Sequence, residues 1–143
     1  MTVKAILSTK GVEVFTIEPT ATLEIAIRGL AERRVGALVV LGADRRVIGI
    51  LSERDIVRAL AEKGAVALKE TLSQVMTRKV HTCAPAETVS TIMERMTTGK
   101  FRHIPVLEQD QLAGIVSIGD VVKHRLVEME RESAALRDYI QTA

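Results

Sequence analysis

The sequence predicts a mixed α/β fold of the α+β type, in which two β-α-β-β-α units pack as a pseudo-twofold pair and an extended helix follows them. Three observations support this prediction. The chain contains an internal duplication, and each copy alternates between strand-like and helix-like apolar spacing. The chain has 143 residues in all, so each copy is too small to cover its sheet by itself. The two copies are therefore expected to pack against each other.

The duplication is visible in two aligned stretches. "VFTIEPTATL" at 14–23 aligns with "VHTCAPAETV" at 80–89, with Val, Thr, Pro and Thr at matching places. "GILSERDIV" at 49–57 aligns with "GIVSIGDVV" at 114–122, with matching Gly, Ile, Ser, Asp and Val. The separation falls from 66 to 65 residues because the loop "GADRRVI" has one residue more than its counterpart "EQDQLA".

Each copy reads in the same order. A short β-branched strand (12–17; 80–83) precedes a Pro and a Thr that suit a helix start. "TLEIAIRGLAERR" and "TVSTIMERMTTGK" carry apolar residues at helical spacing, and the buried-strand runs "VGALVVL" and "HIPVL" follow them. A polar turn, a second strand ("VIGIL"; "LAGIV") and a helix beginning with Ser-x-x-Asp complete the unit. We expect domains at 1–66 and 67–128 and a helical extension at 129–143.

The composition excludes several classes of protein. With 47% hydrophobic and 27% charged residues, the chain is typical of a soluble globular protein. A formal charge of +2 and 2% aromatic residues argue against nucleic-acid binding, which uses basic surfaces and stacking aromatics. The apolar runs are too short for a signal peptide or a membrane span, so no membrane partner is expected. The single cysteine, Cys83, excludes an intramolecular disulfide. These features together predict a cytoplasmic protein.

The repeated Ser-x-x-Asp, at Ser52–Asp55 and Ser117–Asp120, has two interpretations. The first is a capping box, in which the Ser and the Asp satisfy backbone N–H groups at the start of a helix. In the second, the helix N-terminus attracts an anion while the Asp accepts hydrogen bonds from the hydroxyls of a ribose. The two interpretations are compatible, because a capped helix start can still bind a ligand.

"KFRHIPV" places Arg102 and His103 at the entry of an apolar strand. This pair is either a solvated loop end or a phosphate site, since a guanidinium offers paired donors to phosphate and a histidine adds another. The first copy has "RRVGALVV" here, so Gly36 and Ala37 replace the Arg–His pair and Arg34 is the nearest cation. The first copy is therefore expected to bind phosphate less well.

No catalytic or metal-binding pattern stands out. The histidines lack a paired metal-ligand spacing, and no nucleophile–base order is present, so we expect no metal and no enzymatic activity. His103 is the one acid–base candidate. A bound base is expected to meet apolar walls rather than stacking aromatics, and each candidate wall residue is otherwise a core residue; the candidates are Ile50, Val80, Ile104 and Ile115.

The duplicated unit resembles the tandem CBS (cystathionine-β-synthase) domain pair, or Bateman module. The resemblance covers about residues 1–128 and rests on "GILSERD", "GIVSIGD", "FRHIPV" and the duplication itself. It implies a non-catalytic sensor that binds AMP, ADP or ATP in the cleft between the copies, requires no further cofactor, and signals to a separate, unknown regulated protein. The alternatives are a sensor of NAD(H) or S-adenosylmethionine and, less favoured, a nucleic-acid-binding protein or an enzyme.

The resemblance also implies two ligand sites, each with a ribose-binding Asp. The first site takes Asp55, Ser52, Ile50, Val80, His81, Arg102, His103 and Ile104, with Arg78 and Lys79 at its mouth. The second site takes Asp120, Ser117, Ile115, Val12, Arg34, Val35 and Gly36. The second site is expected to bind a charged phosphate more weakly, because it lacks the Arg–His pair and because Gly119 removes a side chain that the family sometimes uses at the phosphate.

The C-terminal stretch "DVVKHRLVEMERESAALRDYIQTA" carries a heptad-like stripe of Val122, Leu126, Met129, Leu136 and Ile140, which Ser133 completes. Such a helix either folds back on its own domain or packs against another subunit. Because CBS pairs commonly associate in twos, the resemblance implies a homodimer.

Overall fold

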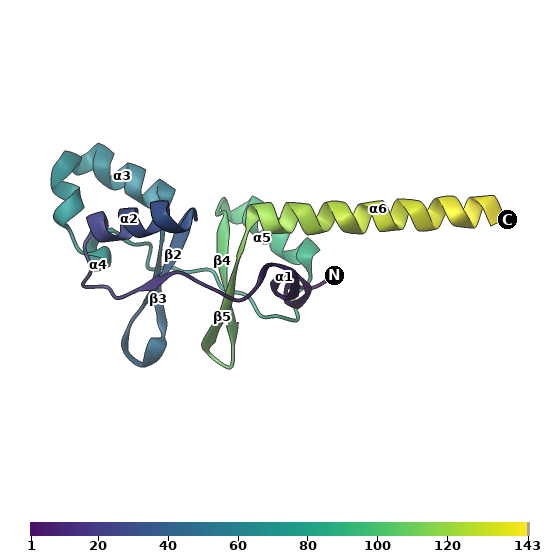
Figure 1. The fold of residues 1–143 in the computed structure, drawn as a ribbon, viewed down its shortest axis with the longest axis horizontal. Helices are drawn as coiled ribbons and strands as arrows, with labels where there is room; N and C mark the ends of the chain where they lie inside the picture. Colours follow the sequence, from purple (N-terminus) through teal and green to yellow (C-terminus); the bar gives the residue numbers. More distant parts are fainter. Residues whose placement is uncertain (143) are drawn as a thin grey trace.

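The computed structural model describes residues 1–142 and contains two sheets side by side, each with its own helices (Figure 1). The first sheet has the strand order β1 (Thr16–Ile17), β2 (Ala37–Leu41), β3 (Val47–Ser52). In it, β1 is parallel to β2, and β2 is antiparallel to β3. The second sheet is an antiparallel pair, β4 (His103–Glu108) and β5 (Gln111–Ser117). The predicted mixed fold of two similar units is confirmed.

The helices fall into two matching groups. Those of the first unit are α2 (Leu23–Arg33), α3 (Glu53–Lys63) and α4 (Leu72–Val75), with the 3-10 helices η1 (Ala43–Arg45) and η2 (Gly64–Lys69). Those packed on the second sheet are α1 (Val3–Lys10), α5 (Val89–Gly99) and the start of α6 (Ile118–Thr142). None of the helices within residues 1–142 is long and apolar enough to cross a membrane.

Each unit has its own hydrophobic core, built from the apolar faces that the sequence predicts. In α2 the buried side chains are Leu23, Ala26 and Leu30, which pack with Leu38 and Leu51 of the first sheet. In α5 they are Val89, Ile92 and Met96, which pack with Ile104 and Val106 of the second sheet. The matching residues Thr22 and Thr88 cap these two helices by accepting a backbone N–H three residues on.

The first strand of each unit is shorter in the structure than the sequence predicts. Of residues 12–17 only β1 forms, and in 80–83 the strand is reduced to a single parallel bridge between Cys83 and Val106. In the second unit the cause is Pro105, which stands where the first unit has Val39. The Val39 N–H donates to Phe15 O at 2.9 Å, whereas proline has no N–H to donate to the neighbouring chain.

Helix α1 was not expected from the sequence, and it belongs to the core of the second unit. Val3, Ile6 and Leu7 are buried there. Val3 N–H donates to Glu87 O at 2.9 Å, and in the first unit Leu72 N–H donates to the matching Ala21 O at 2.9 Å. The N-terminal segment therefore packs on the second unit in the same way as the segment around α4 packs on the first.

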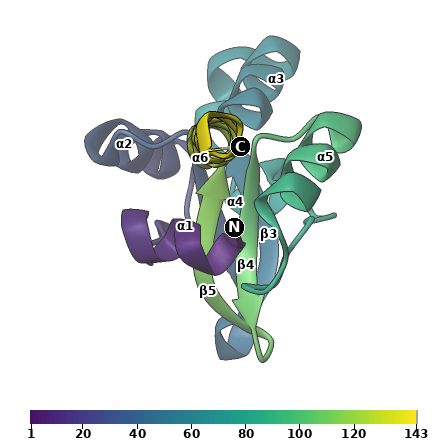
Figure 2. The ribbon, with the colours of Figure 1, turned by 90° about the vertical axis from the view of Figure 1, so that its right-hand side faces the viewer.

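Helix α6 projects away from the two sheets (Figures 1 and 2). Val121 is its only buried residue within 118–142. The stripe residues Leu126, Met129, Leu136 and Ile140 are all exposed. The helix does not fold back on its own domain over the described residues, which leaves packing against another molecule as the remaining expectation.

Candidate ligand site in the cleft between the two units

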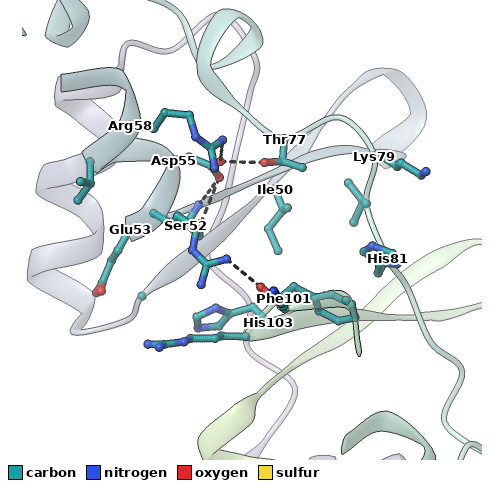
Figure 3. A pocket seen from close by; sticks show the side chains of 17 residues that line it. Ile50, Ser52, Glu53, Asp55, Arg58, Thr77, Lys79, His81, Phe101 and His103 are labelled. Carbon is teal, nitrogen blue, oxygen red and sulfur yellow. Dashed lines mark hydrogen bonds and ion pairs between the residues drawn. The ribbon is translucent and has the colours of Figure 1, made fainter. Parts of the chain in front are cut away.

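A cavity of about 530 Å³ lies between the two units (Figure 3). Its walls are the end of β3 and the start of α3, the linker at 77–81, and the segment 99–103 that leads into β4. The volume lies within the range of about 300–1,000 Å³ that is typical of small-molecule sites. Both units are needed to form this cavity, because each contributes one wall.

Nearly all residues expected in the first ligand site line this cavity. They are Asp55, Ser52, Ile50, Val80, His81, Arg102 and His103, and Lys79 lies at the same wall. The expectation for Ile104 was wrong, because its side chain is fully buried in the second core. Successive side chains of a strand point to opposite faces, so His103 faces the cavity and Ile104 faces the core.

Asp55 lies at the N-terminus of α3, where hydrogen bonds from Ser52 and from Thr77 of the linker hold its carboxylate. Its Oδ2 accepts the backbone N–H of Ser52 at 2.9 Å and the Ser52 hydroxyl at 3.2 Å, as part of a capping box. Its Oδ1 accepts the hydroxyl of Thr77 at 2.8 Å and lies 3.6 Å from the Arg58 guanidinium. The capping interpretation is thus confirmed for this copy, and the side chain is only 5% exposed.

The cavity is rich in positive charge. Its cations are Arg54, Arg58, Lys79, Lys100 and Arg102, against the two carboxylates Glu53 and Asp55. The N-terminus of α3 adds the partial positive charge of its free N–H groups. A cleft lined mainly by one sign of charge concentrates ligands of the opposite sign, so this cavity favours an anion.

One of these cations also joins the two units. The Arg54 guanidinium donates to the carbonyl of Lys100 at 2.8 Å, from the start of α3 to the segment before β4. Arg54 was not among the residues expected from the sequence. Its position in the motif "SERD" shows that it starts a helix, but only the packing of the units shows that it reaches the other copy.

The expectation of purely apolar walls was wrong, because an aromatic pair lines the cavity. The imidazole of His81 stacks on the ring of Phe101, with centroids 4.3 Å apart and planes 8° from parallel. Figure 3 shows the pair on the side of the cavity away from Asp55. A flat base therefore has a π-surface available next to the apolar side chains of Ile50 and Val80.

His103 is half-buried at the base of the cavity. Burial lowers the pKa of His103, and the nearby Glu53 carboxylate opposes this only in part. Gly36, which was expected in the second site, lines this cavity. A Cβ at Gly36 would lie 3.3 Å from Glu53 Oε1 and 3.4 Å from His103 Cε1, so a side chain at position 36 would crowd this wall.

The second Ser-x-x-Asp has a different partner. Asp120 Oδ2 accepts the backbone N–H of Ser117 at 2.8 Å and the Lys10 ammonium at 2.7 Å. Lys10 also donates to Ile115 O at 3.0 Å. Burial raises the pKa of Asp120, but the hydrogen bonds from Lys10 and Ser117 outweigh burial and leave this pKa below its ordinary value.

The other residues expected in the second site lie apart from the cavity. Val12 and Val35 are 65% and 43% exposed, and Arg34 ends α2 in the left-handed conformation. Ser117 and Ile115 lie at the end of β5 beside Lys10. Within residues 1–142 no group of three or more His, Cys, Asp or Glu side chains could hold a metal ion. Cys83 is buried, and burial raises the pKa of its thiol to about 12.

The sequence and the fold have counterparts among known proteins. The family model of the CBS domain matches residues 3–62 and 72–127. CBS domain-containing protein CBSX3, mitochondrial, from Arabidopsis thaliana is 36% identical over 124 residues; the match covers 84% of this chain but only 60% of that protein. The chain therefore spans less than two thirds of this relative's length.

Solved structures match over almost their whole length. The CBS-domain containing protein ATU1752 from Agrobacterium tumefaciens is 46% identical with a TM-score of 0.84, and the match covers 87% of this chain and 92% of that one. The CBS domain pair of protein MJ0100, solved in complex with 5'-methylthioadenosine and S-adenosyl-L-methionine, is 25% identical with a TM-score of 0.77. That match covers 86% of this chain and 98% of the other.

Proposed function

We propose that this chain, which belongs to the CBS-domain family, is a regulatory module that binds an adenine nucleotide (AMP, ADP or ATP) in the cleft between its two units and performs no chemistry. The observation that carries the proposal is the pairing of two features across one cavity. Asp55 stands at the N-terminus of α3 on one wall, and the cations of the second unit, including Arg102, stand on the other.

Each part of a nucleotide finds a suitable group in this cavity. An ionised carboxylate offers about four lone-pair positions, and Asp55 uses three of them on Ser52 and Thr77. A ribose hydroxyl would take the fourth, on the side where the exposed Arg58 guanidinium lies 3.6 Å from Oδ1. The phosphates suit Arg102 and the N-terminus of α3. The base suits the space between Ile50, Val80 and the His81–Phe101 pair.

The positive charge of the cavity favours some of the alternative ligands over others. The MJ0100 pair was solved with S-adenosyl-L-methionine, which carries a positive sulfonium. The excess of cations in this cavity disfavours such a ligand and favours one with phosphates. NAD(H) combines adenosine with phosphates and is therefore the closer alternative to AMP, ADP and ATP.

Binding in this cleft would act on the placement of the two units. A ligand that contacts both walls stabilises one arrangement of the units over others, and it can shift the equilibrium only by its difference in affinity for the two. The Arg54–Lys100 contact lies at the same wall and would respond to such a change. A separate regulated protein would respond to this change in the arrangement of the units.

Calorimetric titration tests the proposal. We expect one of AMP, ATP or NADH to bind and S-adenosylmethionine to bind more weakly. The variant Arg102→Ala should lose about tenfold in affinity for the phosphate-bearing ligand, because it removes a charged hydrogen-bond donor. The matched control is Lys4→Ala, which removes one exposed positive charge on α1. Absence of binding, or equal loss in both variants, would contradict the proposal.

A further inference from the structure

The apolar stripe of α6 is uncovered. Val122, Leu126, Met129, Leu136 and Ile140 are 40%, 55%, 50%, 60% and 65% exposed. They follow one another at alternating steps of four and three residues, and Ser133 fills the one gap, which is the spacing of a coiled-coil seam. A single projecting helix with an exposed seam of this length gains little stability from its own backbone and is stabilised when a second helix covers the seam.

Charged residues beside the seam indicate which helix covers it. With Leu126, Ser133 and Ile140 at the first core position of each heptad, Glu130 and Arg137 flank the seam on one side. Both side chains are exposed, and neither forms an ion pair within residues 1–142. The flank therefore carries one negative and one positive charge at a seven-residue spacing, a pattern that a second copy of the same helix can match by running in the opposite direction.

We propose that α6 pairs with α6 of a second copy of this chain as an antiparallel two-stranded coiled coil. In the register that we infer, Met129 packs on the partner's Ile140, and Ser133 packs on the partner's Leu136. This register places Glu130 beside the partner's Arg137, and symmetry repeats the pair, so two ion pairs form along that flank.

Neighbouring registers are disfavoured by charge. A shift of one heptad in one direction places Glu130 beside the partner's Glu130, and Lys123 beside the partner's Arg137. A shift in the other direction places Arg137 beside the partner's Arg137 and shortens the overlap to one heptad. Each of these registers sets like charges side by side, which destabilises a coiled coil by about as much as opposite charges stabilise it.

The flanking charges would also suit a parallel pair, with Glu130 beside the partner's Arg125 and Arg137 beside the partner's Glu132. The shape of the molecule, however, disfavours that arrangement. Figure 2, which looks along α6, shows α2, α3, α5 and the strands on several sides of the helix. In Figure 1 α2, α3 and the first sheet lie beyond the N-terminal end of α6, while α5 and α1 lie beside its first turns. A twofold axis parallel to α6 and close to it would rotate the partner's sheets and helices into the same space. In the antiparallel pair the overlap from Met129 to Ile140 lies on the projecting part, and the two bodies lie at opposite ends.

The association should be of moderate strength, because the seam is short and contains Ser133. We expect a dissociation constant on the order of micromolar, measured by sedimentation equilibrium of the full chain over a range of concentrations. Leu136→Asp should weaken the dimer by about tenfold or more, and Ser133→Leu should strengthen it by about tenfold, because it fills the seam with an apolar side chain. Circular dichroism checks that each variant folds.

Charge reversal tests the register itself. Glu130→Arg or Arg137→Glu alone should weaken the dimer, because each sets like charges together in both symmetry-related pairs. The double variant should restore it, because the pairs are re-formed with their signs exchanged. In a parallel dimer the double variant would not restore the association. Positions 130 and 137 would then lie beside the partner's Arg125 and Glu132 of the other flank, so the two reversals would set like charges together.

The matched control reverses the same two charges on the outward face, with Arg131→Glu and Asp138→Arg, which are also seven residues apart and exposed. It should leave the dimer unchanged. The proposal is overturned if the full chain stays monomeric at high concentration, if Leu136→Asp has no effect, or if the double reversal fails to restore the dimer. None of these measurements needs a nucleotide, so they test the dimer independently of the proposed function.

Discussion

The two aspartates of the repeated motif differ in the group that neutralises them. Asp55 accepts the neutral hydroxyl of Thr77, while Asp120 accepts the charged ammonium of Lys10. Thr77 follows α4, and Lys10 ends α1, so the two donors come from the counterpart segments of the two units but from different positions in them. The cation nearest Asp55 is the exposed Arg58 guanidinium at 3.6 Å, which leaves much of the carboxylate's charge for a further donor, whereas the Lys10 ammonium at 2.7 Å largely cancels the charge of Asp120.

This difference predicts that Lys10 holds the second site closed to a ligand. Removing the ammonium in Lys10→Ala frees the Asp120 carboxylate and the carbonyl of Ile115, so affinity for the nucleotide at the second site should rise by about tenfold. Calorimetry should then show more than one ligand bound per chain. The control Lys4→Ala removes a charge on the same helix away from Asp120; an unchanged ligand count in Lys10→Ala would disprove the role of Lys10.

His103 predicts a pH dependence of folding stability. Burial lowers the pKa of His103 below the ordinary 6.5, while Glu53 and Asp120 raise it in part and Lys10 and Arg102 lower it further. Between the folded pKa and 6.5 the unfolded chain binds more protons, so stability rises with pH in that window. The contribution of neutral His103 is complete above 6.5 and is lost as the pH falls towards the folded pKa.

The measurement is the urea midpoint of the wild-type chain and of His103→Gln at a series of pH values from about 5 to about 8. The wild-type midpoint should fall more steeply than that of the variant as the solution is acidified below 6.5. Parallel curves for the two proteins would mean that His103 does not titrate differently in the folded state.

Some site residues could be predicted from the sequence and others could not, for a physical reason. Asp55 and Ser52 belong to a motif that occurs twice, and a local helix start fixes their position. Phe101 and Arg54 reach the cavity through the packing of one unit on the other, and position 101 is Val35 in the first copy, so repetition gives no signal. Ile104 was misplaced because one strand position separates the cavity face from the core face.

At the level of elements, the repeat predicts the hairpins and long helices but misses what differs between copies. Strand β1 has no full counterpart in the second unit, because Pro105 removes a donor that Val39 supplies in the first. Helix α1 was missed because it has no aligned partner helix: its counterpart is the segment around α4, where the chain has a different length and sequence.

The burial of α1 predicts that the first residues of the chain stabilise the second unit. Ile6 is fully buried among Ile92, Val106 and their neighbours, so Ile6→Ala should lower the free energy of unfolding by about 2–5 kcal/mol. Chemical denaturation followed by circular dichroism gives the value. Lys4→Ala on the exposed face of α1 should change it by less than about 0.5 kcal/mol. An equally small change in Ile6→Ala would mean that α1 packs less firmly than the structure shows.

On the scale of the whole molecule, the chain crosses between the units twice. The N-terminal helix packs on the second sheet, the chain then builds the first unit, and the linker 77–81 returns along the cavity wall. A ligand in the cavity therefore contacts β3 and α3 of one unit, the linker, and the segment before β4 of the other. Its binding energy is expected to stabilise these three segments together.

Hydrogen exchange tests this coupling directly. With the nucleotide at about a hundredfold excess over its dissociation constant, global stability should rise by about 2.7 kcal/mol. If the ligand bridges the units, amides at the start of α3 and amides at 101–104 should slow together, although they belong to different units. In Arg102→Ala, saturated with ligand, protection at the start of α3 should persist while protection at 101–104 declines. Protection confined to one unit in the wild-type chain would mean that the ligand binds one wall only, and a module of that kind could not report binding through the placement of its two halves.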